Sequence, residues 1–247
     1  MSDHRDHRNH RNHPRPKFTY VGHATVLCEL PGGEVVLIDP WVQGNPSCPE
    51  SLKKLDRVDA VLITHAHFDH IGDAVAPCKE HRPKKVVASF ETCHWLESKG
   101  VKNCSGMNLG GCQDVLGLQV TMVRADHSCG ISDGDQILYG GSAAGYVVRL
   151  PGGYTFYHSG DTALFSDMQL FGEIYRPELA FLPIGDLFTM DPGQAARACR
   201  YLGVRKVIPV HWGTFPALTG TPEKLRKALG DDVVTCELIV LNPGESY

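Results

Sequence analysis

Four side chains that can bind a metal ion follow one short apolar run. Residues 58–64 read Val-Asp-Ala-Val-Leu-Ile-Thr, and His65, His67, Asp69 and His70 come soon after them. The run is long enough for a buried strand and too short for a helix. Imidazole and carboxylate groups together suit zinc, with manganese and iron as competitors. A solvated loop would explain one histidine but not this cluster, which therefore predicts part of a metal site.

Other expected strands end in residues of the same chemistry. We expect strands at 118–124, 154–158 and 207–210. The candidate ligands just beyond their ends are His127, Asp161 and His211, and His158 also lies at one of these ends. Because one short segment cannot surround a metal ion, these widely spaced residues are expected to supply the remaining ligands.

Asp39 follows a predicted hairpin. Residues 18–30 and 34–38 have the composition of strands, and Pro31-Gly32-Gly33 between them is typical of a tight turn. An acidic residue at a strand end can simply form a turn. It can also hold a metal-binding histidine through the second ring nitrogen, and we expect this role for Asp39.

The remaining elements are expected to alternate along the chain. Residues 128–144 are rich in Gly and Ser and are expected to form a surface loop. We expect helices at 71–81, 91–99, 192–202 and 222–229, and further strands at 85–88, 145–150, 179–183 and 233–241.

The two halves of the chain echo each other. The segment 30–39 contains Leu-Pro-Gly-Gly, a strand and an Asp, and the segment 150–161 has the same order. Residues 58–65 align without a gap with residues 204–211, and both end in His. This pattern indicates two similar β/α halves whose strand ends face each other.

Composition favours one soluble domain. The chain has 247 residues, of which 42% are hydrophobic and 21% charged, with a formal net charge of -4. This charge favours neither nucleic acid nor an anionic membrane as a partner, and no apolar run approaches the roughly 18 residues of a membrane span. The 9 cysteines form no Cys-x-x-Cys pair. With no signal peptide, reduced thiols and a cytoplasmic location are expected.

The first sixteen residues differ from the rest. Residues 1–16 contain no apolar residue after Met1 and carry histidines at every third position from His4 to His13. Such a segment cannot bury an apolar face, so we expect a disordered tail outside the folded domain of residues 17–247.

The whole constellation resembles the metallo-β-lactamase superfamily, whose signature is His-x-His-x-Asp-His followed by a distant His, Asp and His. Several other segments are similar to the branch of metal-dependent hydrolases related to ascorbate-6-phosphate lactonase. They are Gly22-His23-Ala24-Thr25, Tyr157-His158-Ser159-Gly160-Asp161-Thr162, Pro183-Ile184-Gly185-Asp186, Phe188-Thr189-Met190 and His211-Trp212-Gly213-Thr214-Phe215-Pro216.

The resemblance implies an α/β fold, a four-layer αββα sandwich in which two facing mixed β-sheets are flanked by helices. It also implies two divalent metal ions. Zinc is the expected metal, and Mn2+ and Fe2+ are the alternatives. The first ion would be held by His65, His67 and His127. The second would be held by Asp69, His70 and His211, with Asp161 between the two ions.

The implied activity is that of a metal-dependent hydrolase. A hydroxide held by two metals would cleave a small ester, lactone or phosphoester. Asp69 could also orient that hydroxide or carry its proton. His23 and His158 are candidates for contact with the substrate or leaving group, or for structural roles beside the site. Asp186 fits a pocket or a turn equally well.

Three other functions remain open from the sequence. A mononuclear-iron, dioxygenase-like oxidoreductase would share most of the ligands, and a non-catalytic metal-binding module would bind metal without turnover. A nucleic-acid-processing relative would carry an inserted domain or a basic arm, for which the core leaves little room. The expected partner is a small-molecule substrate, and a homo-oligomer is compatible with the sequence.

Overall fold

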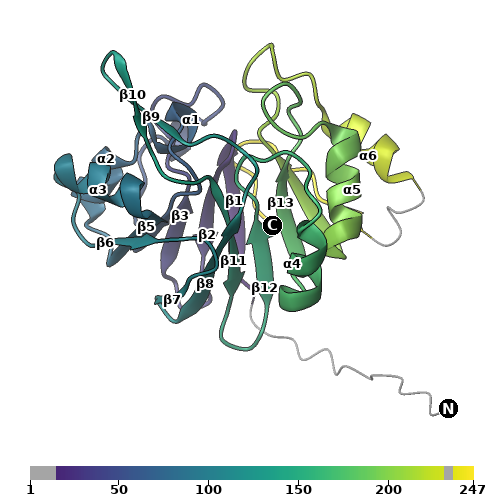
Figure 1. Ribbon diagram of the computed structural model, residues 1–247, viewed down its shortest axis with the longest axis horizontal. Helices are drawn as coiled ribbons and strands as arrows, with labels where there is room; N and C mark the ends of the chain where they lie inside the picture. The colour runs from purple at the N-terminus through teal and green to yellow at the C-terminus, as the bar shows by residue number, and fades with distance from the viewer. Residues whose placement is uncertain (1–14, 231–235) are drawn as a thin grey trace.

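Alternate side chains of the central strands are buried on opposite faces, so each sheet is covered on both sides. In β13 (Leu179–Pro183), Leu179 and Phe181 face one apolar cluster while Ala180 and Leu182 face another. Strands that are buried on both faces lie inside layered α/β folds. The computed structural model, which describes residues 15–230 and 236–247, is accordingly a four-layer αββα sandwich (Figure 1).

The first sheet has six strands in the order β1-β2-β3-β4-β5-β6. Strands β3 to β6 run parallel, and β1 and β2 add antiparallel neighbours. Its strands are β1 (Lys17–Gly22), β2 (Thr25–Glu29), β3 (Val35–Ile38), β4 (Ala60–Leu62), β5 (Lys85–Ser89) and β6 (Cys104–Met107). The helices of this half are α1 (Phe68–Ile71), α2 (Val75–His81) and α3 (Phe90–Ser98).

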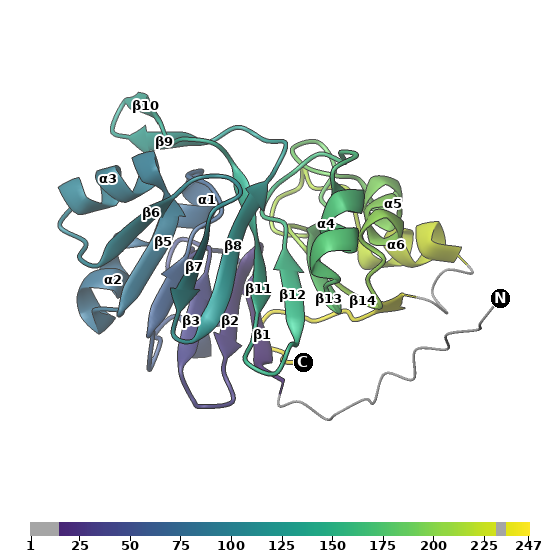
Figure 2. The ribbon, with the colours of Figure 1, turned by 60° about the horizontal axis from the view of Figure 1, so that its bottom comes forward.

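The second sheet has seven strands in the order β15-β14-β13-β12-β11-β8-β7. Besides β13, they are β7 (Cys112–Val115), β8 (Leu118–Arg124), β11 (Ala144–Arg149), β12 (Thr155–His158), β14 (Lys206–Val210) and β15 (Glu237–Leu238). Its outer helices are α4 (Met168–Tyr175), α5 (Pro192–Leu202) and α6 (Pro222–Leu229). Figure 2 shows these helices outside one sheet and α1 to α3 beside the other.

Three apolar clusters fill the three spaces between the four layers. The central cluster takes side chains from both sheets, among them Tyr20, Ile38, Leu62, Tyr146 and Phe181. The second lies between the first sheet and its helices, and the third lies between the second sheet and α4 to α6. The mixed sheets and the helices outside them confirm the fold class expected from the sequence.

Several expected elements match the structure closely. β8, β13, α5 and α6 have the predicted bounds, and both Pro-Gly-Gly turns connect antiparallel neighbours, β2 with β3 and β11 with β12.

Two long expected elements are divided instead. The run 18–30 is two strands, because Gly22 and His23 have φ values of 121° and 58° and turn the chain between β1 and β2. The expected helix at 71–81 begins earlier, as α1, and is interrupted at 72–74 before α2.

The prediction of a surface loop at 128–144 was wrong. This segment contains the hairpin of β9 (Gly130–Asp133) and β10 (Gln136–Tyr139), and it buries Cys129 and Ile131. β6, β7 and α4 were not expected from the sequence. Of the strand expected at 233–241, residues 233–235 lie outside the described residues, and β15 covers only Glu237–Leu238.

The two halves are similar but not equivalent. In the first sheet β3 and β4 are neighbours, whereas β13 lies between β12 and β14 in the second. Their carboxyl ends nevertheless carry Asp39, His65, Asp161 and His211, as the echo in the sequence predicted.

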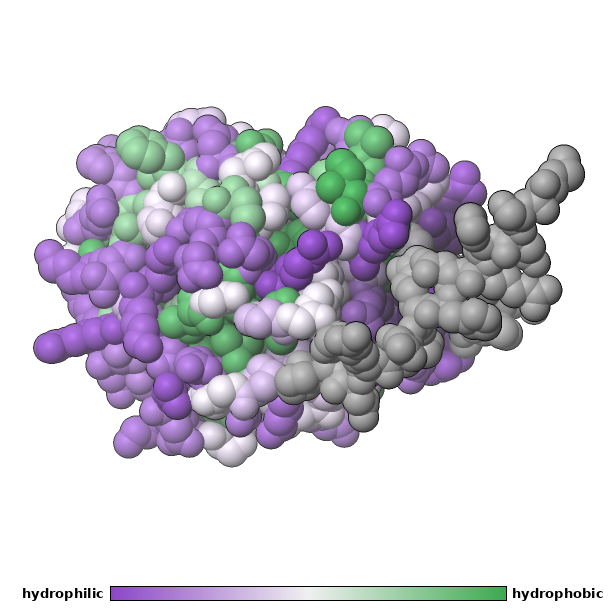
Figure 3. Space-filling model, turned by 90° about the horizontal axis from the view of Figure 1, so that it is seen from below, coloured by the Kyte–Doolittle hydropathy of each residue, from purple (hydrophilic) through white to green (hydrophobic). Residues whose placement is uncertain are grey.

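The opposite end of the sandwich carries the Pro-Gly-Gly turns. Apolar side chains gather in a hollow on the face seen from below (Figure 3), where a groove of about 190 Å³ is lined by Leu30, Pro31, Gly32, Glu34, Leu116, Leu118, Leu150 and Pro151. Among the described residues, no helix is long and apolar enough to cross a membrane.

Candidate metal centre

Three histidines form a first pocket at the strand ends. The Nδ1 atom of His67 lies 3.1 Å from Nε2 of His65 and 3.3 Å from Nε2 of His127. Nitrogen ligands about 2.0–2.1 Å from a tetrahedral zinc ion are about 3.3–3.4 Å apart. These spacings therefore suit three ligands of one cation, as the sequence predicted for this set. His65 follows β4, and His127 follows β8, so both sheets contribute.

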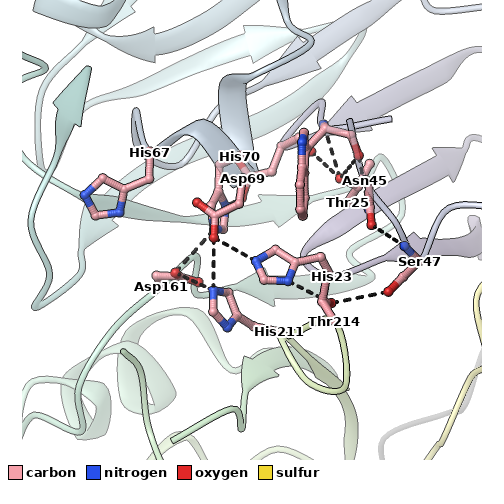
Figure 4. Close-up of polar contacts among 12 residues, drawn as sticks. His23, Thr25, Asn45, Ser47, His67, Asp69, His70, Asp161, His211 and Thr214 are labelled. Carbon is pink, nitrogen blue, oxygen red and sulfur yellow. Dashed lines mark hydrogen bonds and ion pairs between the residues drawn. The ribbon is translucent and has the colours of Figure 1, made fainter. Parts of the chain in front are cut away.

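A second pocket lies beside the first. Ligand atoms of Asp69, His70 and His211 lie within 4.8 Å of one another, and His23 belongs to the same cluster. Asp69 and His70 come from α1, whereas His211 follows β14 of the other sheet (Figure 4). The structure thus brings together both groups of ligands named from the sequence, and it adds His23 to the second.

Asp161 lies between the two pockets. Its Oδ2 atom is 2.9 Å from Nε2 of His211 and 3.2 Å from Nε2 of His70. The same oxygen lies 3.8 Å from Nε2 of His65 and of His127. One buried carboxylate therefore reaches ligands of both pockets.

Asp39 orients the histidines without facing the pockets itself. Its Oδ2 atom lies 2.8 Å from Nδ1 of His70 and accepts a 2.7 Å hydrogen bond from the hydroxyl of Thr64. The Thr64 hydroxyl in turn lies 3.1 Å from Nδ1 of His65. The contact with His70 confirms the predicted role of Asp39. Because the Nδ1 atoms are engaged, the Nε2 atoms of both histidines are left for a cation.

An unpartnered buried atom tests whether a cation fits. Among the described residues, nothing forms a hydrogen bond with Asp161 Oδ1, although this atom is fully buried. Leaving such a group without a partner is costly. A divalent ion would satisfy it, since imidazole nitrogen and carboxylate oxygen are ligands that zinc, manganese and iron accept. The residues present therefore fit the metal implied by the sequence.

The first pocket holds neutral imidazoles. Burial lowers the pKa of His65 well below its usual value, and the charge of His70 adds to this. Burial likewise lowers the pKa of His67 and of His127. Neutral imidazole is the form that binds a metal.

The second pocket is charged. Burial opposes the charged form of His70, but Asp161 and Asp39 outweigh it and raise the pKa of His70 well above its usual value. Burial is likewise outweighed by Asp161 at His211, whose pKa rises to about 9. Burial would raise the pKa of Asp161, yet His211 and His70 hold it well below its usual value. A cation entering this pocket must displace protons.

Unusual backbone conformations place several of these residues. Asp39, His211 and His23 have φ values of 49°, 55° and 58°, in the left-handed region that non-glycine residues seldom adopt. Gly160, at φ 61°, brings the Asp161 loop against the first sheet. A Cβ atom there would lie 2.7 Å from Ala144 O and from Thr64 Cβ. Such strain clusters at functional sites.

The substrate roles predicted for His23 and His158 stay predictions. His158 is fully buried, its ring stacks on Phe181, and its Nδ1 atom accepts a 3.2 Å hydrogen bond from Gly160 N. It contributes to none of the clusters of metal-binding groups among the described residues. Asp186 forms a turn in which its Oδ2 atom accepts a 2.9 Å hydrogen bond from Thr219.

Residues without charge complete the site, and most of their roles were not expected from the sequence. Thr64 and Thr214 contact histidines of the site, and Ser47 contacts Thr214. Phe68, between His67 and Asp69 in the sequence, is 56% exposed and packs on Trp41 with ring centroids 5.9 Å apart. Of these contacts, only that of Thr64 could have been expected from the sequence, because Thr64 directly precedes His65.

The sequence is similar to known proteins over most of its length. Residues 34–212 match the model of the beta-lactamase superfamily domain. A UPF0173 metal-dependent hydrolase of Koribacter versatilis is 53% identical over 231 residues, which are 94% of this chain and 97% of that protein.

Solved structures are similar over nearly the whole chain. Igni18, a metallo hydrolase from the archaeon Ignicoccus hospitalis, has a TM-score of 0.82 and 34% identity, with coverage of 94% of this chain and 97% of that one. An isothiocyanate hydrolase from Delia radicum gut bacteria shares the fold, with a TM-score of 0.71, 24% identity and coverage of 94% and 98%.

Proposed function

Since this chain belongs to the β-lactamase superfamily and is one of its metal-dependent hydrolases, we propose that it holds two divalent cations and cleaves a small ester, lactone or phosphoester. The observation that carries this proposal is the position of Asp161, whose Oδ2 atom lies within 3.8 Å of ligand nitrogens in both pockets. A single carboxylate shared by two ligand groups is expected of a dinuclear site and is not needed in a mononuclear one.

The cations would supply the reactive chemistry. Two divalent ions in these pockets would lower the pKa of a water molecule towards neutrality and polarise the carbonyl or phosphoryl oxygen of the substrate.

The chain's own residues hold that arrangement. Asp161 and the histidines would hold the cations, and Asp39 and Thr64 fix the ring orientation of His70 and His65. Asp69 is the carboxylate with access to the substrate side, because its side chain is 13% exposed while that of Asp161 is 3% exposed. We therefore assign to Asp69 the orientation of the attacking water and the transfer of its proton.

Zinc is the proposed cation in both pockets. Three imidazoles and one carboxylate surround the first position, a ligand set that zinc commonly takes. Manganese or iron would occupy the same ligands if either ion is more abundant in the cell.

The proposed setting is the cytoplasm, with a small molecule as the partner. Among the described residues no cysteine forms a disulfide bond, which supports a reducing compartment. The formal net charge of -4 favours neither nucleic acid nor an anionic membrane. The exposed Phe68, Leu187 and Phe188 are candidates for contact with an apolar part of the substrate, or with a second copy of the chain.

The test combines metal analysis with a substrate panel. Purified protein is assayed for zinc, manganese and iron, and then against lactones, phosphodiesters, phosphotriesters, thioesters and β-lactams, alongside its His65→Ala variant. We expect about two metals per chain and hydrolysis of at least one class, with both reduced in the variant. Protein that carries two metals but hydrolyses none of these classes, and behaves like its variant, contradicts the proposal. Bound iron with oxygen-dependent turnover would identify the oxidoreductase instead.

A further inference from the structure

His23 occupies a turn that reaches into the second pocket. It lies between β1 and β2, is fully buried, and uses both ring nitrogens. Nε2 lies 3.0 Å from Oδ2 of Asp69, and Nδ1 lies 3.0 Å from Oγ1 of Thr214 (Figure 4).

The chemistry of these partners fixes which atom donates. An ionised carboxylate can only accept, so Nε2 of His23 carries the proton and donates a hydrogen bond to Asp69. Nδ1 is then an acceptor, and the hydroxyl of Thr214 donates to it. The hydroxyl of Ser47 lies 3.4 Å from Oγ1 of Thr214 and donates to that oxygen. The donors are therefore Ser47, Thr214 and His23 in that order, and the carboxylate of Asp69 is the final acceptor.

The backbone of His23 holds a second ligand. Its carbonyl oxygen accepts a 2.6 Å hydrogen bond from the N–H of His211 and a 2.9 Å hydrogen bond from the hydroxyl of Tyr20. This requires the left-handed conformation of His23, with φ 58°. Keeping a non-glycine residue in such a conformation costs about 1–3 kcal/mol, which the surrounding contacts must offset.

His23 therefore contacts two ligands of the second pocket that come from different halves of the chain. Its side chain holds Asp69 of α1, and its carbonyl group holds His211 beyond β14. We propose that His23 is a positioning residue for the second cation, which acts by fixing the carboxylate of Asp69 and leaves the first pocket unaffected. This inference rests on the two-cation site of the proposed function.

Direct binding of the cation by His23 is the competing explanation. Its ring centroid is 3.9 Å from that of His211, and its Nε2 atom belongs to the same cluster of ligand atoms. A ligand role would leave Nδ1 as the proton carrier, with Thr214 as its acceptor. The 3.0 Å separation of Nε2 and Asp69 Oδ2 is an ordinary hydrogen-bond length. Donation to the carboxylate is favoured because the hydroxyls of Ser47 and Thr214 supply the donor that Nδ1 needs when Nε2 carries the proton.

Two substitutions at position 23 separate these explanations. His23→Phe keeps a planar ring but removes both hydrogen bonds. His23→Gln replaces the ring with an amide whose N–H group can still donate to Asp69 but which is a poor metal ligand. Thr214→Val removes the hydroxyl that holds Nδ1, while the His23 ring stays in place. Tyr157→Phe is the control, because its buried hydroxyl has no hydrogen-bond partner among the described residues.

The measurement is the affinity of each variant for its first and second zinc ion, obtained by competition with a chromophoric chelator and checked by metal analysis. We expect His23→Phe to weaken the second affinity by about 10–100-fold, the usual effect of losing a partner that orients a ligand. The first affinity should stay within about threefold. His23→Gln should recover most of the loss, and Tyr157→Phe should bind both ions like the wild type.

Each other outcome has a definite meaning. Unchanged binding of both ions by His23→Phe overturns the inference. So does a failure of His23→Gln to recover binding, together with one fewer nitrogen ligand in the X-ray absorption spectrum, since this would make His23 a ligand. If His23→Phe does not fold, Thr214→Val decides, because a weakened second affinity supports the inference and an unchanged one overturns it. A wild-type chain that binds only one cation would instead contradict the proposed two-cation function.

Discussion

Nδ1 of His70 lies 2.8 Å from Oδ2 of Asp39, and both side chains are fully buried. Asp39 follows β3 at the end of the first sheet. Its carboxylate also accepts hydrogen bonds from the backbone N–H and the hydroxyl of Thr64. One carboxylate thus determines the ring orientation of His70 directly and that of His65 through Thr64.

Asp39→Asn should weaken metal binding without removing a ligand. The amide keeps the shape of the side chain but loses its charge, and one of its two polar atoms can no longer accept. We expect metal affinity to fall about 10–100-fold, measured by chelator competition. Asp59→Asn is the matched control, because Asp59 accepts a hydrogen bond from Val35 N at the other end of the same sheet. Equal effects of the two substitutions would argue against an orienting role for Asp39.

Asp161→Ala should disturb both pockets at once. Its Oδ2 atom lies near His65 and His127 as well as His70 and His211, so its loss removes a ligand from each proposed cation. We expect metal content below one ion per chain and loss of hydrolysis. Asp126→Ala is the control, since the side chain of Asp126 is 52% exposed and lies outside the clusters of metal-binding groups. Retention of two ions by Asp161→Ala would contradict the shared position of this carboxylate.

Metal affinity should rise with pH through about pH 9. In the metal-free protein the pKa of His211 is about 9, and that of His70 is raised well above its usual value. A cation must displace these protons, so the second affinity increases as pH rises and levels off only once both His211 and His70 are deprotonated. The first pocket, with lowered histidine pKa values, should change much less over this range. Calorimetry at pH 7 in buffers of different ionisation enthalpy should detect proton release. An absence of release would contradict the charged state of the second pocket.

Gly160→Ala should destabilise the fold more than Gly203→Ala. Gly160 and Gly203 share a φ of 61°, but only the Cβ at position 160 would meet atoms at 2.7 Å, whereas position 203 has open space. Left-handed geometry alone costs about 1–2 kcal/mol, and overpacking adds about 1–3 kcal/mol. Urea unfolding of metal-free protein should give a larger loss of unfolding free energy for Gly160→Ala. Equal losses would show that the contact with Thr64 is readily relaxed.

Sequence patterns predicted the elements whose side chains alternate or repeat regularly. β8 and α5 have the expected bounds because apolar residues recur with the periods of a strand and a helix. β6, with the sequence Cys-Ser-Gly-Met, and the exposed β10 lack such a pattern. Pairing with a neighbouring strand, which no local sequence encodes, makes them strands.

The candidate metal ligands were predictable for a different reason. Imidazole and carboxylate groups at strand ends are rare enough to be noticed, and the structure brings all seven of those predicted into the clusters of metal-binding groups. Thr214 and Ser47 could not be found in this way, since hydroxyl residues are common. Their contacts with His23 depend on loops that meet only in three dimensions.

The shared position of Asp161 has a consequence for the lifetime of the folded chain. In the described part of the chain no disulfide bond joins the two sheets, and cations held between Asp69 and His211 would take the place of such a bond. Binding to the folded chain alone stabilises it by about 4 kcal/mol when the free cation is at a thousand times its dissociation constant. The metal supply of the cell would then govern how long this protein resists unfolding and proteolysis, as well as how fast it works.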